Sequence, residues 1–254
     1  MMKYVLITGA SSGIGKALAE KFAKQNHNLI IVARRDKLLN DLKKELEIKY
    51  KIRVLVYVYD LSIYENVIKF YDQIKNFDIE VFINNAGFGD RNDPWDSDLY
   101  KIKKMIDLNI TALTIFSILF IKDNLNKDVQ LINVSSTAGY KIWLGGIIYS
   151  ASKFYVSVFG EGIAKLILEK KAKLKMKILA PSSTKTEFVT RSVVKSKVDQ
   201  KILKESEAKR SFYQKSPQLL AEYAYKLYQS DKIIGIVDSF KDKFYLEDNY
   251  FEIM

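Results

Sequence analysis

Short apolar runs alternate with helix-length amphipathic segments along almost all of the 254-residue chain. This alternation is typical of βαβ units, in which each strand of a parallel sheet is followed by a helix that packs on the sheet. Each apolar run is nearly continuous, as a strand that is buried on both faces should be. The expected strands are Tyr4–Thr8, Leu29–Ala33, Val54–Tyr59, Val81–Asn84, Val129–Ser135, Met176–Ala180 and Ile233–Val237. The expected helices are Ile14–Lys24, Lys37–Tyr50, Ile63–Lys75, Leu99–Asn124, Tyr149–Ala172 and Leu219–Gln229. The pattern predicts an α/β fold, a doubly wound parallel sheet of seven strands with helices on both faces.

The composition excludes several kinds of site and of organisation. With 3 prolines and no linker-like stretch, residues 1–254 are expected to form a single domain. The chain has no cysteine and one histidine, so disulfides and thiol chemistry are excluded and no metal site is predicted. The N-terminus does not resemble a signal peptide, and Ile110–Ile121 is shorter than the roughly 20 apolar residues of a membrane span. We therefore expect a cytoplasmic protein with no membrane span.

The formal net charge of +11 is concentrated in one part of the chain. Residues 165–215 carry 15 basic and 5 acidic side chains. Within this stretch, residues 186–216 interrupt the last crossover of the sheet, where an insertion is expected to form a basic lid over a substrate. A solvated surface explains the charge, and so does a docking face for an acidic partner or an anionic substrate. Sparse aromatic residues and the lack of a nucleic-acid-binding motif there argue against nucleic acid.

A glycine-rich turn follows the first expected strand, with the sequence Thr8-Gly9-Ala10-Ser11-Ser12-Gly13-Ile14-Gly15. Small residues let the backbone approach a pyrophosphate, which the amide groups at the start of a helix attract. A P-loop is one alternative, but Ala10 replaces its first glycine and Ala17 replaces its Mg²⁺-binding hydroxyl. The other alternative is a tight turn that packs the strand against the helix and binds no ligand.

The glycine spacing, with the preceding threonine, resembles that of the short-chain dehydrogenase/reductase family, in its short single-domain type. The resemblance implies a Rossmann-like fold and a nicotinamide dinucleotide as cofactor. The turn residues that it implies as cofactor contacts are Gly9, Ser11, Ser12, Gly13, Ile14 and Gly15.

The end of the second expected strand bears on the choice between NAD and NADP. An acidic residue there binds the ribose 2′-hydroxyl of NAD, whereas a cation binds the 2′-phosphate of NADP. In the family's pattern Ala33 stands at the acidic position and Arg34 follows it. Because a guanidinium can donate two hydrogen bonds to a phosphate, we predict NADPH or NADP as the cofactor, with Arg34 as a contact. If the strand ended three residues later, Asp36 would bind the ribose and NAD would be the cofactor.

Three further segments resemble cofactor-binding segments of the same family. Asp60-Leu61 resembles its adenine-contacting pair, and Asn84-Asn85-Ala86-Gly87 matches its NNAG motif. The segment from Pro181 to Thr186 resembles the P-G-x-x-x-T segment beside the nicotinamide, with Ser182 in place of the glycine. A positive φ at that serine would cost about 1 kcal/mol. The cofactor contacts implied by these segments are Asp60, Leu61, Asn85, Ala86, Gly87, Pro181 and Thr186.

Tyr149 and Lys153 stand four residues apart at the start of an expected helix, so both project from one face. Tyrosine ordinarily has a pKa of roughly 10, which a neighbouring ammonium lowers by favouring the phenolate, so the pair is expected to act as a tuned acid. Pairs of this spacing also occur by chance on helix surfaces. Ser136 and Asn109 complete a match, in order and spacing, to the Asn-Ser-Tyr-Lys tetrad of the family; Ser135 is the alternative if the register is off by one.

The resemblance implies a role for each catalytic candidate. Ser136 would donate a hydrogen bond to a substrate carbonyl, and Tyr149 would protonate the alkoxide as the cofactor delivers hydride. Lys153 would also hold the nicotinamide ribose, and Asn109 would support a water that returns the proton. We therefore expect an NADPH-dependent reductase of a small-molecule carbonyl compound.

Two other functions stay open at this point. A 3-oxoacyl thioester, as an anionic substrate, would suit the basic segment, and a non-catalytic NADP-binding regulatory protein would retain the same fold. The resemblance also implies a homodimer or homotetramer paired through Leu99–Asn124 and Tyr149–Ala172. Residues 239–254 carry no motif.

Overall fold

The computed structural model describes residues 2–187, 214–238, 241 and 243–252. In this part of the chain eight strands form one sheet, in the order β3-β2-β1-β4-β5-β6-β7-β8. Their bounds are β1 Lys3–Thr8, β2 Asn28–Ala33, β3 Val54–Val58, β4 Asp78–Asn84, β5 Gln130–Val134, β6 Lys175–Ala180, β7 Ile234–Asp238 and β8 Lys243–Glu247. β1 to β7 are parallel, and β8 pairs with β7 in the antiparallel direction. The strand order reverses between β1 and β4, which places a ligand-binding crevice at their carboxyl ends.

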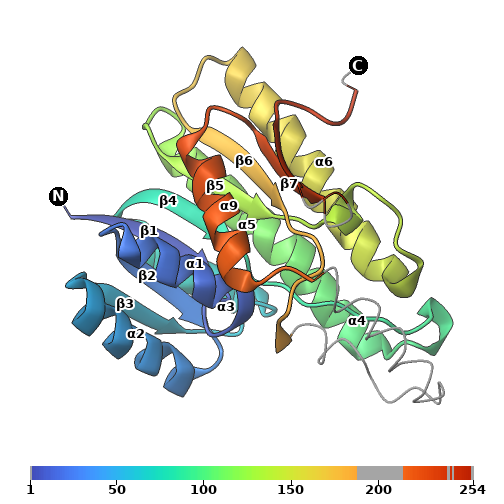
Figure 1. Ribbon diagram of the computed structural model, residues 1–254, viewed down its shortest axis with the longest axis horizontal. Helices are drawn as coiled ribbons and strands as arrows, with labels where there is room; N and C mark the ends of the chain where they lie inside the picture. The colour runs from blue at the N-terminus through green and yellow to red at the C-terminus, as the bar shows by residue number, and fades with distance from the viewer. Residues whose placement is uncertain (1, 188–213, 239–240, 242, 253–254) are drawn as a thin grey trace.

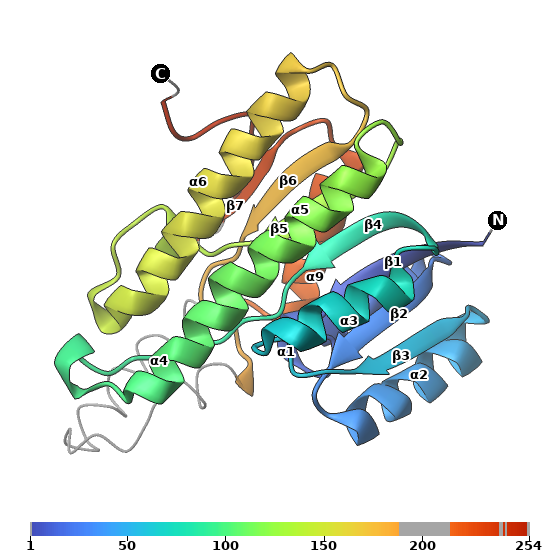
Figure 2. The same ribbon diagram turned by 180° about the vertical axis from the view of Figure 1, so that it is seen from behind.

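Helices cover both faces of the sheet (Figures 1 and 2). One face carries α1 (Gly13–Lys24), α2 (Asp36–Tyr50) and α9 (Pro217–Gln229). The other carries α3 (Tyr64–Ile74), α5 (Leu113–Asn124) and α6 (Ile147–Glu169). α4 (Leu99–Ile106) continues through a π-helical stretch, Asp107–Ala112, into α5. The predicted doubly wound α/β fold is confirmed.

Alternating side chains of the strands build one core on each face of the sheet. Leu6 of β1 belongs to the core with Phe82, under α3 and α5, whereas Val5 and Ile7 belong to the core with Phe22 of α1. All five side chains are fully buried. Successive residues of a strand point to opposite faces, so a strand that is covered on both sides must be apolar throughout. This burial explains why the apolar runs of the sequence are continuous.

The structure adds one strand to the prediction, and one predicted helix has the length of a membrane span. β8 lies within residues 239–254, where the sequence showed no motif, and it extends the expected seven strands by an antiparallel edge strand. The helix Leu99–Asn124 is long and apolar enough to cross a membrane, by length and composition alone. Phe116 and Phe120 of this helix are buried against the sheet. A buried core helix can meet the same criterion of length and composition. The expectation of no membrane span rested on Ile110–Ile121, which is only part of this helix and too short to cross a membrane.

Lys177 of β6 joins the sheet to the C-terminal end of α9. Its side chain is buried, and its Nζ donates hydrogen bonds to the main-chain carbonyls of Leu227 (2.7 Å), Tyr228 (3.1 Å) and Ser230. The last carbonyls of a helix have no partner within the helix. Lys177→Met should therefore lower the free energy of unfolding by about 2 kcal/mol, since it removes three hydrogen bonds from a buried ammonium, although the Ser230 hydroxyl and the Gln130 amide still donate to two of the carbonyls. Thermal or urea denaturation measures this loss.

Lys175 offers a matched control on the same strand. Its ammonium pairs with Asp231 at 3.1 Å, and both side chains are largely exposed. Exposed ion pairs contribute little, so Lys175→Met should change the free energy of unfolding by less than about 0.5 kcal/mol. Equal losses in the two variants would contradict the assigned role of Lys177.

Candidate active site

A cavity of about 1140 Å³ lies at the carboxyl ends of the parallel strands. Open parallel sheets bind their ligands at this edge. Most of the predicted site residues line the cavity: Gly9, Ser12, Gly13, Ile14, Gly15, Arg34, Asp60, Asn85, Ala86, Gly87, Ser136, Tyr149, Lys153, Pro181 and Thr186. The fold thus brings together motifs that are spread over 178 residues of sequence.

Three predicted site residues lie outside the cavity wall. Leu61 is part of the hydrophobic core, and the Ser11 hydroxyl accepts a hydrogen bond from Nε of Arg35 (3.1 Å). Asn109 is buried within the π-helical stretch; its side-chain amide accepts from the N–H of Phe88 (3.1 Å) and donates to the carbonyl of the same residue (2.9 Å). The structure therefore places Ser11, Leu61 and Asn109 behind the wall, in supporting positions.

Glycine is required at two positions of the turn by close backbone packing. Gly9 has a φ of +70°, and a Cβ there would lie 2.9 Å from Cα of Ala86. A Cβ on Gly15 would lie 2.3 Å from the carbonyl oxygen of Gly9 and 2.6 Å from Nδ2 of Asn85. The same Nδ2 donates a hydrogen bond to the carbonyl of Thr8 (2.8 Å). The turn is thus fixed against the end of β4, with the start of α1 at the cavity, an arrangement suited to a phosphate.

The arginine pair after β2 lies beside this turn. Arg34 lines the cavity, with Nη1 3.7 Å from a carboxylate oxygen of Asp60. Burial acts to raise the pKa of Asp60, but hydrogen bonds from Ser62 and the charge of Arg34 outweigh it, so this pKa lies below its ordinary value. Arg35 donates from Nη2 to Ser11 (3.0 Å), while its Nη1 pairs with Glu187 (2.9 Å). The sequence singled out Arg34 only, although the adjacent second arginine was a visible signal.

Asp36 occupies a different environment from the arginine pair. It is the first residue of α2, and its Oδ1 accepts a hydrogen bond from the Asn40 side chain (2.6 Å). A carboxylate in the first turn of a helix is favourable without any ligand. β2 ends at Ala33, as expected, so the geometry gives no support to Asp36 as a ribose ligand.

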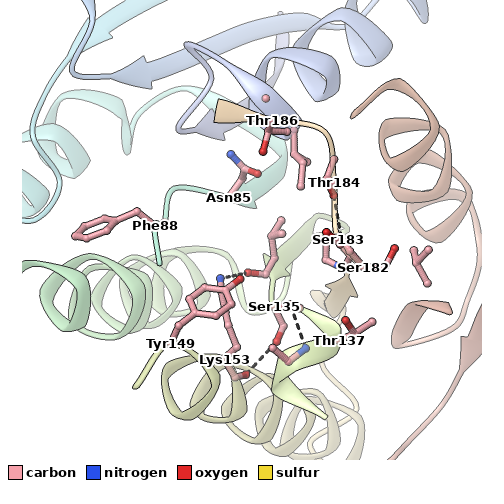
Figure 3. A pocket seen from close by; sticks show the side chains of 18 of the residues that line it. Asn85, Phe88, Ser135, Thr137, Tyr149, Lys153, Ser182, Ser183, Thr184 and Thr186 are labelled. Carbon is pink, nitrogen blue, oxygen red and sulfur yellow. Dashed lines mark hydrogen bonds between the residues drawn. The ribbon is translucent and has the colours of Figure 1, made fainter. Parts of the chain in front are cut away.

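Ser136, Tyr149 and Lys153 meet beside the end of β5. Tyr149 and Lys153 lie side by side on α6 (Figure 3). The Ser136 side chain neighbours the Tyr149 hydroxyl and acts to lower its pKa. The hydroxyl of Ser135 contacts α6 instead, through the Lys153 carbonyl (3.0 Å) and the Ser157 hydroxyl (2.7 Å). The geometry therefore favours Ser136 over Ser135 as the residue that faces a substrate.

Burial dominates the ionisation of the two α6 side chains. It raises the pKa of Tyr149 to about 12, although the hydrogen bond with Ser136 and the charge of Arg91 act to lower it. Burial also lowers the pKa of Lys153 to about 8. Nζ of Lys153 donates to the carbonyl of Val134 (2.8 Å) and lies 5.9 Å from the Tyr149 ring centroid. The expectation that Lys153 lowers the pKa of Tyr149 is not met in this structure, because Lys153, with a pKa of about 8, has lost its charge before Tyr149 titrates.

Ser182 adopts an ordinary backbone conformation in place of the family's glycine. Among the described residues other than glycine, positive φ occurs at Asn26, Lys51 and Lys171, so the expected backbone cost at Ser182 does not arise. Its side chain is buried at the cavity wall, and Oγ has no hydrogen-bond partner among the described residues. A buried hydroxyl without a partner is costly, so this position suits a polar ligand group.

The two ends of the predicted basic lid meet at the cavity. The N–H of Lys185 donates to the carbonyl of Lys215, and the N–H of Lys215 donates to the carbonyl of Ser183, both at 3.0 Å. Glu187 lines the cavity next to this bridge. Residues 188–213, which make up most of the predicted lid, lie outside the described residues.

The cavity wall also contains side chains that sequence reasoning did not single out. Arg91 lies over the ring of Trp143, with Cζ 5.3 Å from the ring centroid, and Trp143 packs edge to face on Tyr149 at 6.3 Å. Tyr245 and Tyr250 line the cavity from β8 and from the segment that follows it. The high density of aromatic residues at the end of the chain was the only sequence signal for these last two.

Comparisons with known proteins identify similar sequences and folds. The family model described as short chain dehydrogenase matches residues 3–197. The NADP-dependent 3-hydroxy acid dehydrogenase of Schizosaccharomyces pombe is 33% identical over 192 residues, which are 73% of each chain. The very-long-chain 3-oxoacyl-CoA reductase of Anas platyrhynchos is 30% identical over 169 residues, covering 63% of this chain and 53% of its own.

Solved structures show the same arrangement. A short-chain dehydrogenase from Sphingobium yanoikuyae in complex with NADPH has a TM-score of 0.80 at 25% identity, covering 92% of this chain and 87% of its own. One from Burkholderia phymatum in complex with NAD also has a TM-score of 0.80, at 20% identity, over 91% of this chain and 87% of its own.

Proposed function

The chain belongs to the short-chain dehydrogenase family, a family of oxidoreductases that bind NAD or NADP, and from this premise we propose that it reduces a small-molecule carbonyl compound to an alcohol with NADPH. The observation that carries the proposal is the meeting of Ser136, Tyr149 and Lys153 in the cavity that the glycine turn also lines. The relative from Schizosaccharomyces pombe is NADP-dependent, and the Sphingobium yanoikuyae structure contains NADPH. Both support the choice of cofactor.

The residues of the cavity fit such a cofactor. The close-packed glycine turn at the start of α1 would hold the pyrophosphate, and the pair Arg34 and Arg35 would hold the 2′-phosphate. Ser182, with its buried hydroxyl, and Thr186 lie where polar groups of the nicotinamide half would find partners. When bound, the nicotinamide would supply the hydride that the carbonyl carbon accepts.

The chain's own residues would supply the proton and the stabilising charge. Ser136 donates a hydrogen bond to the carbonyl oxygen, which polarises the C=O bond. Tyr149 stays protonated near neutral pH, since its pKa is about 12, and gives its proton to the same oxygen as negative charge develops there. Lys153 carries its positive charge below pH about 8 and favours the phenolate that is left behind. One hydride and one proton are thereby added across the C=O bond.

The direct test mixes purified protein with NADPH and, one at a time, a set of ketones and aldehydes. The loss of NADPH absorbance is followed in each mixture. The proposal predicts NADPH oxidation that depends on the carbonyl compound, with the matching alcohol as product. Tight NADPH binding without any consumption of a carbonyl compound would contradict it and would instead favour a regulatory, cofactor-binding role.

A 3-oxo acid or its thioester is a second candidate substrate. Arg91 lines the cavity, and its positive charge acts to lower the pKa of Tyr149. The substrate end of the cavity therefore contains a cation. Two relatives carry the names of a 3-hydroxy acid dehydrogenase and a 3-oxoacyl-CoA reductase. This candidate predicts that a 3-oxo acid is reduced at least tenfold faster than a neutral ketone of the same size and that added salt narrows the difference.

Arg34 should determine the preference for NADPH over NADH. Arg34→Ser removes a guanidinium from the predicted 2′-phosphate site, so the KM for NADPH should rise about tenfold or more, while the KM for NADH changes little. Initial rates with each cofactor measure the two values. Arg53→Ser, which removes a cation at the opposite end of β2, should leave both unchanged. An equal rise for NADPH and NADH would argue against a phosphate contact of Arg34.

A further inference from the structure

The last described residues of the chain lie against the cavity. Glu247, Asn249 and Tyr250 belong to the cavity wall, together with Tyr140 and Trp143. The C-terminal segment follows β8 and passes beside α6, the helix that carries Tyr149 (Figure 2). Of residues 249–251, here called the tail, Asn249 and Tyr250 therefore line the same cavity as the candidate catalytic residues.

A buried carboxylate holds the tail in place. Glu161 lies on α6 and is only 4% exposed. Its Oε2 accepts hydrogen bonds from the main-chain N–H groups of Tyr250 (2.7 Å) and Phe251 (3.1 Å). Burying a carboxylate is costly unless hydrogen bonds compensate, and charge-assisted bonds of this kind are strong. Glu161 thus fixes the path of the tail at two successive residues.

Ring packing connects the tail to the loop that carries Ser136. The Tyr250 ring meets Tyr140 edge to face at 4.7 Å, and Phe251 stacks on the same ring at 5.6 Å. The Tyr250 hydroxyl also donates to the main-chain carbonyl of Tyr140 (3.4 Å). Burial, and next the Glu161 carboxylate, raise the pKa of Tyr140, which keeps this ring neutral beside the tail. Tyr140 follows Ser136 by four residues, so the tail packs directly on the loop behind the candidate catalytic serine.

We propose that Tyr250 is a specificity-determining residue, whose ring contacts an aromatic or similarly apolar substituent of the substrate, and that Glu161 is the positioning residue that holds it there. This inference rests on the proposed reduction of a carbonyl compound. Tyr250 remains 50% exposed despite its packing on Tyr140, so part of its ring is available to a ligand. Trp143 adds a second aromatic surface to the same cavity. The substrate class is therefore a ketone with an apolar ring on one side of the carbonyl.

The test compares acetophenone with 2-butanone as substrates at saturating NADPH. Tyr250→Ala should lower kcat/KM for acetophenone about tenfold or more relative to that for 2-butanone, mainly through KM, because only the larger ketone loses an apolar contact. Glu161→Ala should shift the same ratio in the same direction, since it releases the tail. Tyr250→Phe retains the ring and should stay within about twofold of the wild type.

Two controls separate this role from a general loss of structure. The Kd for NADPH, measured by nicotinamide fluorescence, should not change in any of these variants. Tyr64→Ala removes an exposed ring on α3, outside this cavity, and should leave the ratio of the two ketones unchanged. If Tyr250→Ala and Glu161→Ala lower the activity on both ketones by one common factor, the tail is only a structural support and the proposal is wrong.

A wild-type protein that reduces neither these nor any other carbonyl compounds would contradict the proposed function itself. Hydrogen exchange of residues 249–252 in the presence of NADP then decides the role of the tail. Slower exchange on addition of acetophenone, lost in Glu161→Ala, would support the tail as a binding wall. Exchange that acetophenone does not alter would overturn it.

Discussion

Replacing Tyr149 with phenylalanine should lower kcat/KM for carbonyl reduction about a hundredfold or more, because the variant loses the group that protonates the developing alkoxide. The ring itself is buried and packs on Trp143, so phenylalanine should keep the fold and the shape of the cavity. The Kd for NADPH should therefore change little. Initial rates, together with a fluorescence titration of NADPH, measure both quantities.

Tyr155 provides a control on the same helix. Its hydroxyl forms a hydrogen bond with Thr114 (2.9 Å), and its side chain is exposed. Tyr155→Phe should therefore leave kcat/KM within about twofold of the wild type. Activity of Tyr149→Phe at the wild-type level would refute the assignment of Tyr149 as the proton donor.

Lys153→Met should produce the second large loss, again about a hundredfold in kcat/KM, because no positive charge then stabilises the Tyr149 phenolate. Lys153 is buried, and its Nζ donates to the carbonyl of Val134 (2.8 Å), so methionine fills much of the same space but leaves that carbonyl without its donor. Circular dichroism and thermal denaturation show whether the variant keeps its fold. A folded Lys153→Met protein with unchanged kcat/KM would contradict a role for the ammonium.

The pH dependence of the wild type tests the same charge without a mutation. Burial lowers the pKa of Lys153 to about 8, so its ammonium is present below that pH and is lost above it. The value of kcat/KM for NADPH reports ionisations of the cofactor-free protein, so it should fall as the pH rises through about 8. Tyr149, with a pKa of about 12, keeps its proton throughout this range. A profile that stays flat up to pH 10 would show that Lys153 does not govern the reaction.

The parallel part of the fold could be predicted because its cause is local. A strand that is buried on both faces is apolar at every position, and β1, with Val5, Leu6 and Ile7, shows this directly. β8 could not be predicted in this way, because it exists through its pairing with β7, for example of Leu246 with Gly235. Its own five residues carry no comparable signal.

The candidate site was predictable where motifs follow strand ends. Gly9 and Asn85 come directly after such an end and Ser136 follows one by two residues, and the sheet brings them to one cavity. Arg35, Glu161 and Tyr250 were missed, since the contacts of each depend on segments distant in sequence. The pKa of Tyr149 was misjudged for a similar reason, because burial depends on the whole surrounding structure. Pairing of two copies through Leu99–Asn124 and Tyr149–Ala172 and a cytoplasmic location stay predictions.

Deuterium transfer from NADPH tests the central claim most directly. The purified protein is incubated with acetophenone and NADPH deuterated at C4 of the nicotinamide, on each face in turn, and the product is examined by mass spectrometry. A hydride reduction predicts 1-phenylethanol with one deuterium on its carbinol carbon from one of the two labelled cofactors, and almost no product with Tyr149→Phe. Alcohol without deuterium from either cofactor, or equal amounts of product from the wild type and Tyr149→Phe, would contradict the account.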